Sequence, residues 1–141
     1  KAEQEAAVAQ LGDVTFFEGF TPEELARVAD LADEVEAEAG AELMDQGRPG
    51  LECYVILDGT AGVYFGGEHI ATLEAGSMVG EMALIDHRPR SATVVAESPM
   101  RLLAFDTRHF RALLDELPKA SQRVMSLLNA RAQENAARND T

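Results

Sequence analysis

Glycines divide the middle of the chain, from Glu34 to Asp106, into short runs that alternate polar and apolar residues or are rich in β-branched ones. Runs such as "ECYVILDG", "SATVVAE" and "MRLLAFD" are typical of strands. The separating glycines are Gly40, Gly47, Gly50, Gly59, Gly66, Gly67 and Gly76. Parallel strands need connections of about a dozen residues or more, for which these intervals leave no room. The spacing therefore disfavours a doubly wound α/β fold and predicts a meander of hairpins that closes into a barrel or jelly roll.

Helices are expected before the strands, within residues 1–33. The stretch "FTPEELARVADLA" offers Thr21 as N-cap, Pro22 at the first helical position and Glu24 to complete a capping box. The preceding "AEQEAAVAQL" also has helix-forming composition. Two short helices are therefore predicted at the start of the chain.

Helices are also expected after the strands, within residues 107–141. Thr107 is the predicted N-cap of "TRHFRALLDEL", and Pro118 is expected to end this helix. A last helix follows, with an apolar stripe at Val124, Leu127 and Leu128. This stripe either packs on the strands of its own chain or forms a homodimer through the C-terminal helix.

Composition limits the class of protein. The chain has 141 residues and is 46% apolar, which suits a single domain over residues 1–141 with a real core. A net charge of -13 argues against nucleic acid as a partner, because phosphate backbones are bound by clustered Lys and Arg. The single cysteine, Cys53, is expected to be a buried thiol. There is neither a membrane segment nor a signal peptide, so we expect a soluble, cytoplasmic protein.

Enzyme signatures are missing from the sequence. His69, His87 and His109 lack the close spacing of a metal site, so no metal and no cofactor is predicted. Ser91 does not lie in a G-x-S-x-G motif, and no phosphate-binding glycine motif of a nucleotide hydrolase or dehydrogenase occurs. We therefore expect no catalytic residues and no enzymatic activity.

The stretch "EAGSMVGEMALIDHRPRS" has the residue types of an anion site. Gly76 and Gly80 permit unusual backbone conformations, and "EMALI" can form one short helical turn with free N–H groups. Arg90 follows Pro89, and its planar guanidinium matches two phosphate oxygens. Glu81 would repel a phosphate but can accept hydrogen bonds from nearby hydroxyls. A sugar joined to a phosphate supplies both groups.

The segment "GEMALIDHRPRSATV" resembles the phosphate-binding cassette of the cyclic nucleotide-binding domain family, whose pattern is G-E-hydrophobic-A-hydrophobic, a variable loop, then P-R-small-A-T-V. The stretches "FFEGFTPEELARVADLA", "CYVILDGTAGVY" and "LLAFDTRHFRALL" are similar to further elements of this family. The resemblance implies an α+β fold: N-terminal helices, an antiparallel β-roll over residues 34–106 that holds the cassette at 76–92, and C-terminal helices that close over the ligand.

The resemblance also implies roles for individual residues. Arg90 would bind the cyclic phosphate, and Glu81 the ribose 2'-hydroxyl, with Gly80 allowing close approach. Backbone N–H groups would complete the phosphate cradle at Met82, Ala83, Ser91 and Ala92, and apolar contacts to ribose and base would come from Val63, Ile70 and Val79. Val79 replaces a frequent aromatic and Met82 a leucine, which keeps both contacts apolar. In the loop "IDHRP", Arg88 is an alternative phosphate ligand, and Asp86 and His87 are expected at a solvated tip.

The implied function is binding of cAMP, or alternatively cGMP, by a regulatory sensor whose C-terminal helices transmit the signal. Threonine often follows the arginine in cGMP-selective members of the family, whereas Ser91 stands here. The reader of the signal would be an effector protein or an attached output domain, neither of which is recognisable. Two alternatives remain: a ligand-free interaction scaffold, in which Glu81 and Arg90 form a salt bridge, and a metalloenzyme on a similar barrel, which would need bound metal.

Overall fold

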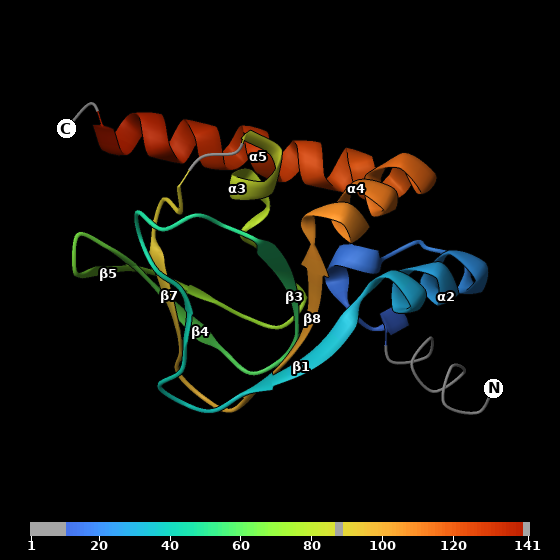
Figure 1. Ribbon diagram of the computed structural model, residues 1–141, viewed down its shortest axis with the longest axis horizontal. Helices are drawn as coiled ribbons and strands as arrows, with labels where there is room; N and C mark the ends of the chain where they lie inside the picture. The colour runs from blue at the N-terminus through green and yellow to red at the C-terminus, as the bar shows by residue number, and fades with distance from the viewer. Residues whose placement is uncertain (1–10, 87–88, 140–141) are drawn as a thin grey trace.

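Two four-stranded antiparallel sheets form the centre of the computed structural model, which describes residues 11–86 and 89–139 (Figure 1). One sheet has the order β1 (Asp33–Ala37), β8 (Met100–Asp106), β3 (Glu52–Asp58), β6 (Met78–Val79). The other has the order β2 (Glu42–Met44), β7 (Thr93–Ala96), β4 (Ala61–Phe65), β5 (Glu68–Leu73). Every pair of neighbouring strands is antiparallel, as the glycine spacing predicts.

The two sheets share an apolar interior but do not close into a barrel. Met44 and Val94 from one sheet lie in the same buried cluster as Ile56 and Leu102 from the other. Each sheet keeps its own edge strands among those described, β1 and β6 in the first and β2 and β5 in the second. The antiparallel β-roll with flanking helices is therefore confirmed, whereas the closed barrel is wrong. The predicted meander of hairpins is wrong as well. Among the described strands, only β4 and β5 are neighbours both in the chain and in a sheet, because the other successive strands pass from one sheet to the other.

The N-terminal side of the roll carries η1 (Thr15–Phe17) and α2 (Pro22–Leu31). The capping box is confirmed, because the backbone N–H of Glu24 donates to Thr21 Oγ1 over 3.1 Å and that of Thr21 donates to Glu24 Oε1 over 2.8 Å. The earlier helix predicted from "AEQEAAVAQL" lies, apart from its last residue, outside the described residues.

On the C-terminal side, α4 (Thr107–Glu116) and α5 (Pro118–Asn139) follow the roll, and α3 (Glu81–Asp86) lies within it. The break at Pro118 is confirmed, but Thr107 is not the N-cap. Asp106 has the extended backbone of a cap, and its carboxylate accepts the backbone N–H of His109 over 2.8 Å. Aspartate caps at least as well as threonine, and Asp106 precedes Thr107 in the chain. Asp106 is therefore the cap, and the helix begins at Thr107.

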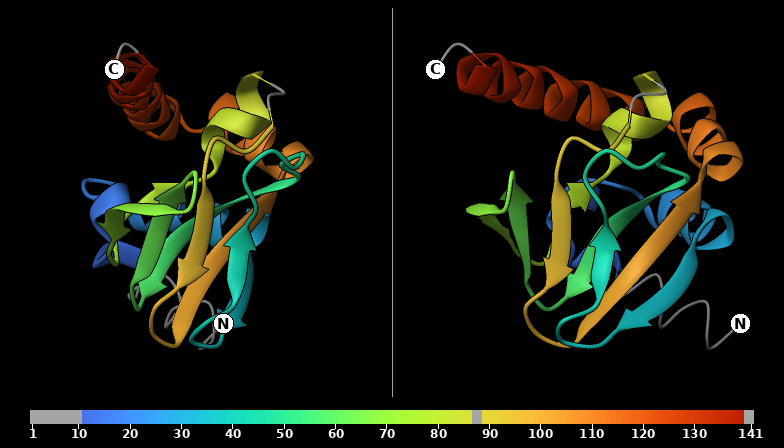
Figure 2. Two further views of the ribbon diagram at one scale, coloured as in Figure 1. Left: turned by 90° about the vertical axis from the view of Figure 1, so that its left-hand side faces the viewer. Right: turned by 60° about the vertical axis from the view of Figure 1, so that its left-hand side comes forward.

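Helix α5 packs across one end of the roll beside α3 (Figures 1 and 2). Val124 is fully buried in the core of its own chain, together with Phe105 of β8 and Leu113 of α4. Leu127 and Leu128 are partly buried against the same cluster. The start of the apolar stripe therefore packs within the chain, the first of the two alternatives, and Val124 is not available to a dimer interface.

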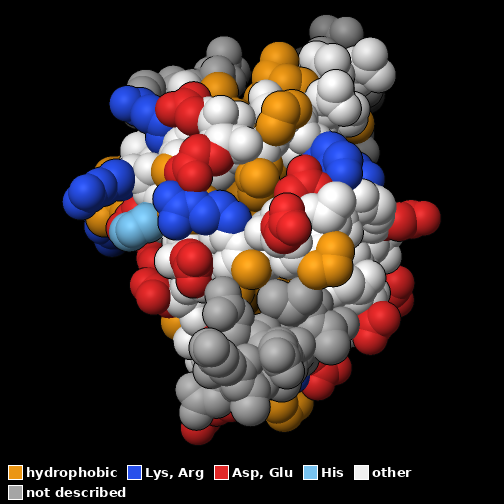
Figure 3. Space-filling model, turned by 90° about the vertical axis from the view of Figure 1, so that its right-hand side faces the viewer, with side chains coloured by type: hydrophobic (Ala, Val, Ile, Leu, Met, Phe, Trp, Pro, Cys, Tyr) orange, Lys and Arg blue, Asp and Glu red, His pale blue; other side chains and the backbone are white. Residues whose placement is uncertain are grey.

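Cations of α5 hold the N-terminal segment in place. Lys119 Nζ donates to the carbonyl of Gly19 over 2.9 Å and lies 2.8 Å from Glu24 Oε1. The Arg123 guanidinium donates to the carbonyls of Phe16 and Glu18. Figure 3 shows acidic and basic side chains next to one another on this helical face. Lys119 and Glu24 thus form an ion pair between α5 and α2. None of the helices described in the structure is long and apolar enough to cross a membrane.

Candidate functional site

The backbone of Arg90 is fixed by the loop between β2 and β3. Its N–H donates to the carbonyl of Arg48 over 2.8 Å, and its carbonyl accepts the N–H of Gly47 over 2.9 Å. Pro49 and Pro89 form an antiparallel bridge beside these bonds. Because two distant loops pair here, the arginine is held by hydrogen bonds of both its backbone N–H and its backbone carbonyl.

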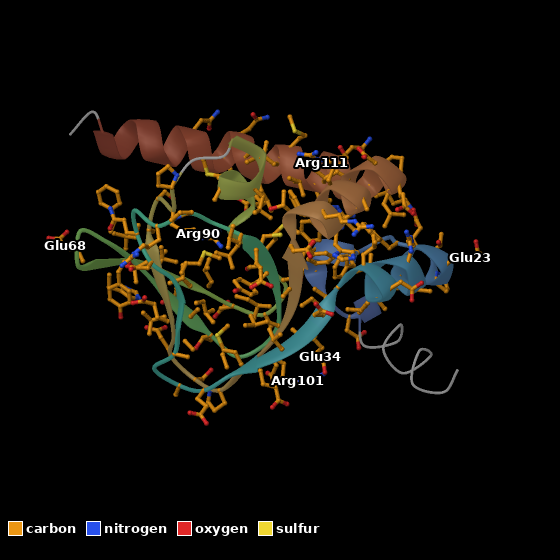
Figure 4. All side chains as sticks on the ribbon, in the orientation of Figure 1. Glu23, Glu34, Glu68, Arg90, Arg101 and Arg111 are labelled. Carbon is orange, nitrogen blue, oxygen red and sulfur yellow. The ribbon has the colours of Figure 1, made fainter. Side chains whose placement is uncertain are left out.

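The Arg90 side chain points into the roll below α3 and is 8% exposed (Figure 4). Nη1 donates to the carbonyl of Gly80 over 3.0 Å, and Nη2 to the carbonyl of Glu52 over 2.5 Å. Burial lowers the pKa of the Arg90 guanidinium, but an arginine keeps its charge at any physiological pH. The structure therefore holds a buried cation on two backbone carbonyls.

Two glycines provide the space that the guanidinium fills. A Cβ on Gly50 would lie 2.8 Å from Arg90 Cζ and 2.5 Å from the Cβ of Ala83 in α3. A Cβ on Gly80 would lie 2.7 Å from Arg90 Nη1, and the φ of 91° at Gly80 favours glycine in any case. The side chains that closely approach Gly80 in this structure are thus those of Met44, whose Cε would lie 2.5 Å from the added Cβ, and Arg90.

Glu81 opens α3 directly after Gly80 and is fully buried. Its field reaches two neighbours: it adds to burial in raising the pKa of the Cys53 thiol, and it opposes the lowering of the pKa of Arg90. Because Arg90 Nη1 also bonds the carbonyl of Gly80, the residue just before Glu81, the structure brings Glu81 and Arg90 close to one another.

The remaining predicted site residues differ in position. Met82 is half-buried and Ala83 buried in α3, while Ser91 is exposed and Ala92 half-buried between Arg90 and β7. Val63 of β4 and Val79 of β6 belong to one cluster in the roll interior. Ile70 of β5 is 37% exposed and belongs to neither buried cluster. The structure thus brings Val63 and Val79 together but not Ile70.

The loop after α3 is only partly described. Asp86 is the last residue of α3, and His87 and Arg88 lie outside the described residues. The alternative role of Arg88 and the solvated tip thus stay predictions. Across the part of the chain that is described, no group of three or more His, Cys, Asp or Glu residues could hold a metal ion.

Sequence reasoning missed three residues that complete the surroundings of Arg90. Gly50 contributes only space, and Glu52 binds Nη2 through its carbonyl. Neither role uses a functional side chain that could be recognised in the sequence. The hydroxyl of Tyr54 donates to Glu52 Oε1 over 3.3 Å. Burial, with the nearby Glu52, raises the pKa of Tyr54. Only the position of Gly50 just before a strand could have indicated its importance.

Comparison with known proteins gives a consistent result. A sequence model described as "Cyclic nucleotide-binding domain" matches residues 34–116. The chain is 35% identical over 107 residues to the cAMP-dependent protein kinase type II regulatory subunit of Drosophila melanogaster. This match covers 76% of the chain but only 28% of that relative.

Solved structures agree in fold. The catabolite activator protein of Thermus thermophilus is similar with a TM-score of 0.78 and 29% identity, over 89% of this chain and 62% of that one. The regulatory subunit of a cAMP-independent protein kinase A from Trypanosoma brucei has a TM-score of 0.77 and 26% identity, over 94% and 46% of the two chains. The resemblance found in the sequence is therefore confirmed.

Proposed function

Since the chain belongs to the cyclic nucleotide-binding domain family, we propose that it binds a cyclic nucleotide, preferably cAMP, and acts as a regulatory sensor. The Drosophila relative, a regulatory subunit of a cAMP-dependent kinase, supports both parts. The chain spans less than a third of that relative, so this match does not identify the output that the chain controls. We assign it sensing without catalysis of its own.

The observation that carries this proposal is the way in which two backbone carbonyls hold the buried Arg90 guanidinium. The guanidinium has five N–H donors, and the described structure uses two of them on the carbonyls of Gly80 and Glu52. These bonds orient the group while further donors remain for an anion. In an otherwise acidic chain, a preorganised and poorly hydrated cation is what a phosphate diester requires.

Glu81 adds a second requirement for the ligand, which must carry hydroxyl donors as well as a phosphate. A buried carboxylate next to a phosphate repels it, unless the ligand also brings hydroxyl donors. A ribose 2'-hydroxyl satisfies this requirement in a cyclic nucleotide. We assign the phosphate to Arg90 with backbone N–H groups from Met82, Ala83, Ser91 and Ala92, and the apolar contacts to Val63, Val79 and the more exposed Ile70.

Ser91 bears on the choice of base. It is exposed, and it stands where cGMP-selective relatives often carry threonine. Serine permits both bases, and we favour cAMP. If the Ser91 hydroxyl bonds guanine, Ser91→Ala will lower the affinity for cGMP and spare that for cAMP. An equal loss for both nucleotides would instead assign the hydroxyl to the phosphate.

The route to an output runs from α3 to α5. Ile85 of α3 and Leu127 and Leu128 of α5 are partly buried against the same core cluster, and the two helices are in contact. A ligand held by Arg90 and Glu81 would bias the position of α3, and α5 would follow. Hydrogen exchange tests this: cAMP should slow exchange in α5 as well as in residues 76–92. Protection confined to the cassette would contradict signal transfer through α5.

A ligand-free scaffold is the second candidate, because the similar Trypanosoma brucei protein belongs to a cAMP-independent kinase. Thermal unfolding separates the two functions. At a cAMP concentration 100-fold above Kd, binding stabilises the folded state by about 2.7 kcal/mol, which corresponds to a rise in Tm of roughly 10 °C for a domain of this size. An unchanged Tm with millimolar cAMP and with millimolar cGMP would favour the scaffold.

A further inference from the structure

A groove of about 380 Å³ opens where the chain passes from one sheet to the other. Its lining includes Val35 of β1, Leu43 of β2, Tyr54 of β3 and Leu102 of β8. Figure 2 shows β1 and β2 leaving their common turn toward different sheets. The groove therefore has an apolar lining between two strands that are not paired with each other.

Both strands beside the groove are sheet edges. Among the described strands, β1 pairs only with β8, and β2 pairs only with β7. An edge strand presents unpaired backbone N–H and C=O groups, which an extended segment of another chain can bind. The groove thus combines backbone hydrogen-bonding capacity with pockets for apolar side chains.

The rim of the groove is acidic. Four glutamates line it, Glu36, Glu38, Glu42 and Glu52, and its lining contains no Lys, Arg or His. Within the described part of the chain, none of the first three takes part in an ion pair, whereas nearby Glu34 bonds Arg101 over 2.7 Å. Acidic residues on an edge strand can also serve only to prevent unwanted pairing, but that task does not require an apolar groove between them.

We propose that the groove between β1 and β2 binds an extended, basic segment of a partner protein. Successive side chains of an extended segment point to opposite sides. Apolar residues at alternate positions would enter the groove, and the intervening Lys or Arg residues would lie near the glutamates of the rim. The groove shares Glu52 and Tyr54 with the surroundings of Arg90, so the test is made without nucleotide.

The test is fluorescence anisotropy with a labelled nonapeptide of alternating arginine and valine, titrated with the protein at physiological salt without nucleotide. We expect saturable binding, and none for the peptide of alternating glutamate and valine. The variant Glu36→Gln/Glu42→Gln should bind the basic peptide about fivefold or more weakly, because two ion pairs are lost. These exposed residues can be changed without disturbing the core.

A matched control separates the groove from net charge. Glu23→Gln/Glu68→Gln makes the same change in charge at exposed positions far from the groove (Figure 4). It should bind the basic peptide as the wild type does, and bound peptide should slow hydrogen exchange in β1 and β2. No binding, an equal loss in both double variants, or equally tight binding of spermine at the same glutamates would overturn the proposal.

Discussion

Replacing Gly50 with alanine is expected to disturb both the stability of the domain and the position of Arg90. The added methyl group would lie 2.5 Å from the Cβ of Ala83 and 2.8 Å from Arg90 Cζ. Carbon atoms pack best at about 3.5–4.0 Å, so the overlap is on the order of 1 Å with each. Since Ala83 belongs to buried α3, relief requires movement of the helix, the guanidinium or the loop that carries Gly50.

Overpacking of this kind lowers the free energy of unfolding by about 1–3 kcal/mol, or lowers Tm by roughly 4–12 °C. Displacement of the guanidinium should also weaken cAMP binding, by about tenfold or more if one charge-assisted bond to the phosphate is lost. Urea denaturation and calorimetric titration measure the two effects separately.

Gly12→Ala is the matched control. Gly12 is helical, and its added Cβ would make an ordinary contact of 3.7 Å with Leu25 Cδ1. Alanine there should leave cAMP affinity unchanged and leave stability unchanged or raise it by about 0.5–1 kcal/mol. A Gly50→Ala protein as stable as the wild type, with unaltered affinity for cAMP, would refute the close packing of Arg90 and Ala83 against Gly50.

Three further outcomes are expected. Glu81→Gln should weaken cAMP binding by about 1.5–3 kcal/mol but hardly change the binding of 2'-deoxy cAMP. If calorimetry gives equal losses for both ligands, Glu81 does not bind the 2'-hydroxyl. Burial raises the pKa of the Cys53 thiol, so the folded state keeps a proton that the unfolded state releases above pH 9.0. The free energy of unfolding should therefore fall above that pH. An equally steep fall with pH in Cys53→Ala would be inconsistent with this. Asp106→Ala should destabilise the protein by about 0.5–2 kcal/mol in urea and Thr107→Ala by much less, the reverse order counting against Asp106 as N-cap.

Features that depend on neighbouring residues could be predicted from the sequence. The capping box at Thr21 and Glu24 needs only two residues three positions apart. The hairpin of β4 and β5 has Gly66 and Gly67 at its turn, as glycine spacing predicts. The cassette is one continuous stretch from Gly80 to Val94, so its resemblance was visible without the fold. The structure then shows Arg90 Nη1 bonded to the carbonyl of Gly80, the residue just before Glu81.

Features that depend on distant backbone could not be predicted. The partner of Arg90 Nη2 is a carbonyl 38 residues earlier, at Glu52, and any residue type supplies a carbonyl. Gly50 matters because it lacks a side chain, which no search for functional groups detects. Closure of the roll depends on how far two sheets diverge, which alternation along single strands does not record. Asp106 and Thr107 both suit an N-cap, and only the geometry separates them.

Calorimetric titration of cAMP into the wild type, Arg90→Ala and Arg111→Ala tests the central claim most directly. Arg111 is an exposed arginine of α4, away from the cassette, so its loss makes the same change in charge (Figure 4). We predict that the wild type and Arg111→Ala bind cAMP equally, and that folded Arg90→Ala loses roughly 2–5 kcal/mol, about 30-fold to several thousand-fold in Kd. Binding of cAMP with wild-type affinity by folded Arg90→Ala would contradict the account.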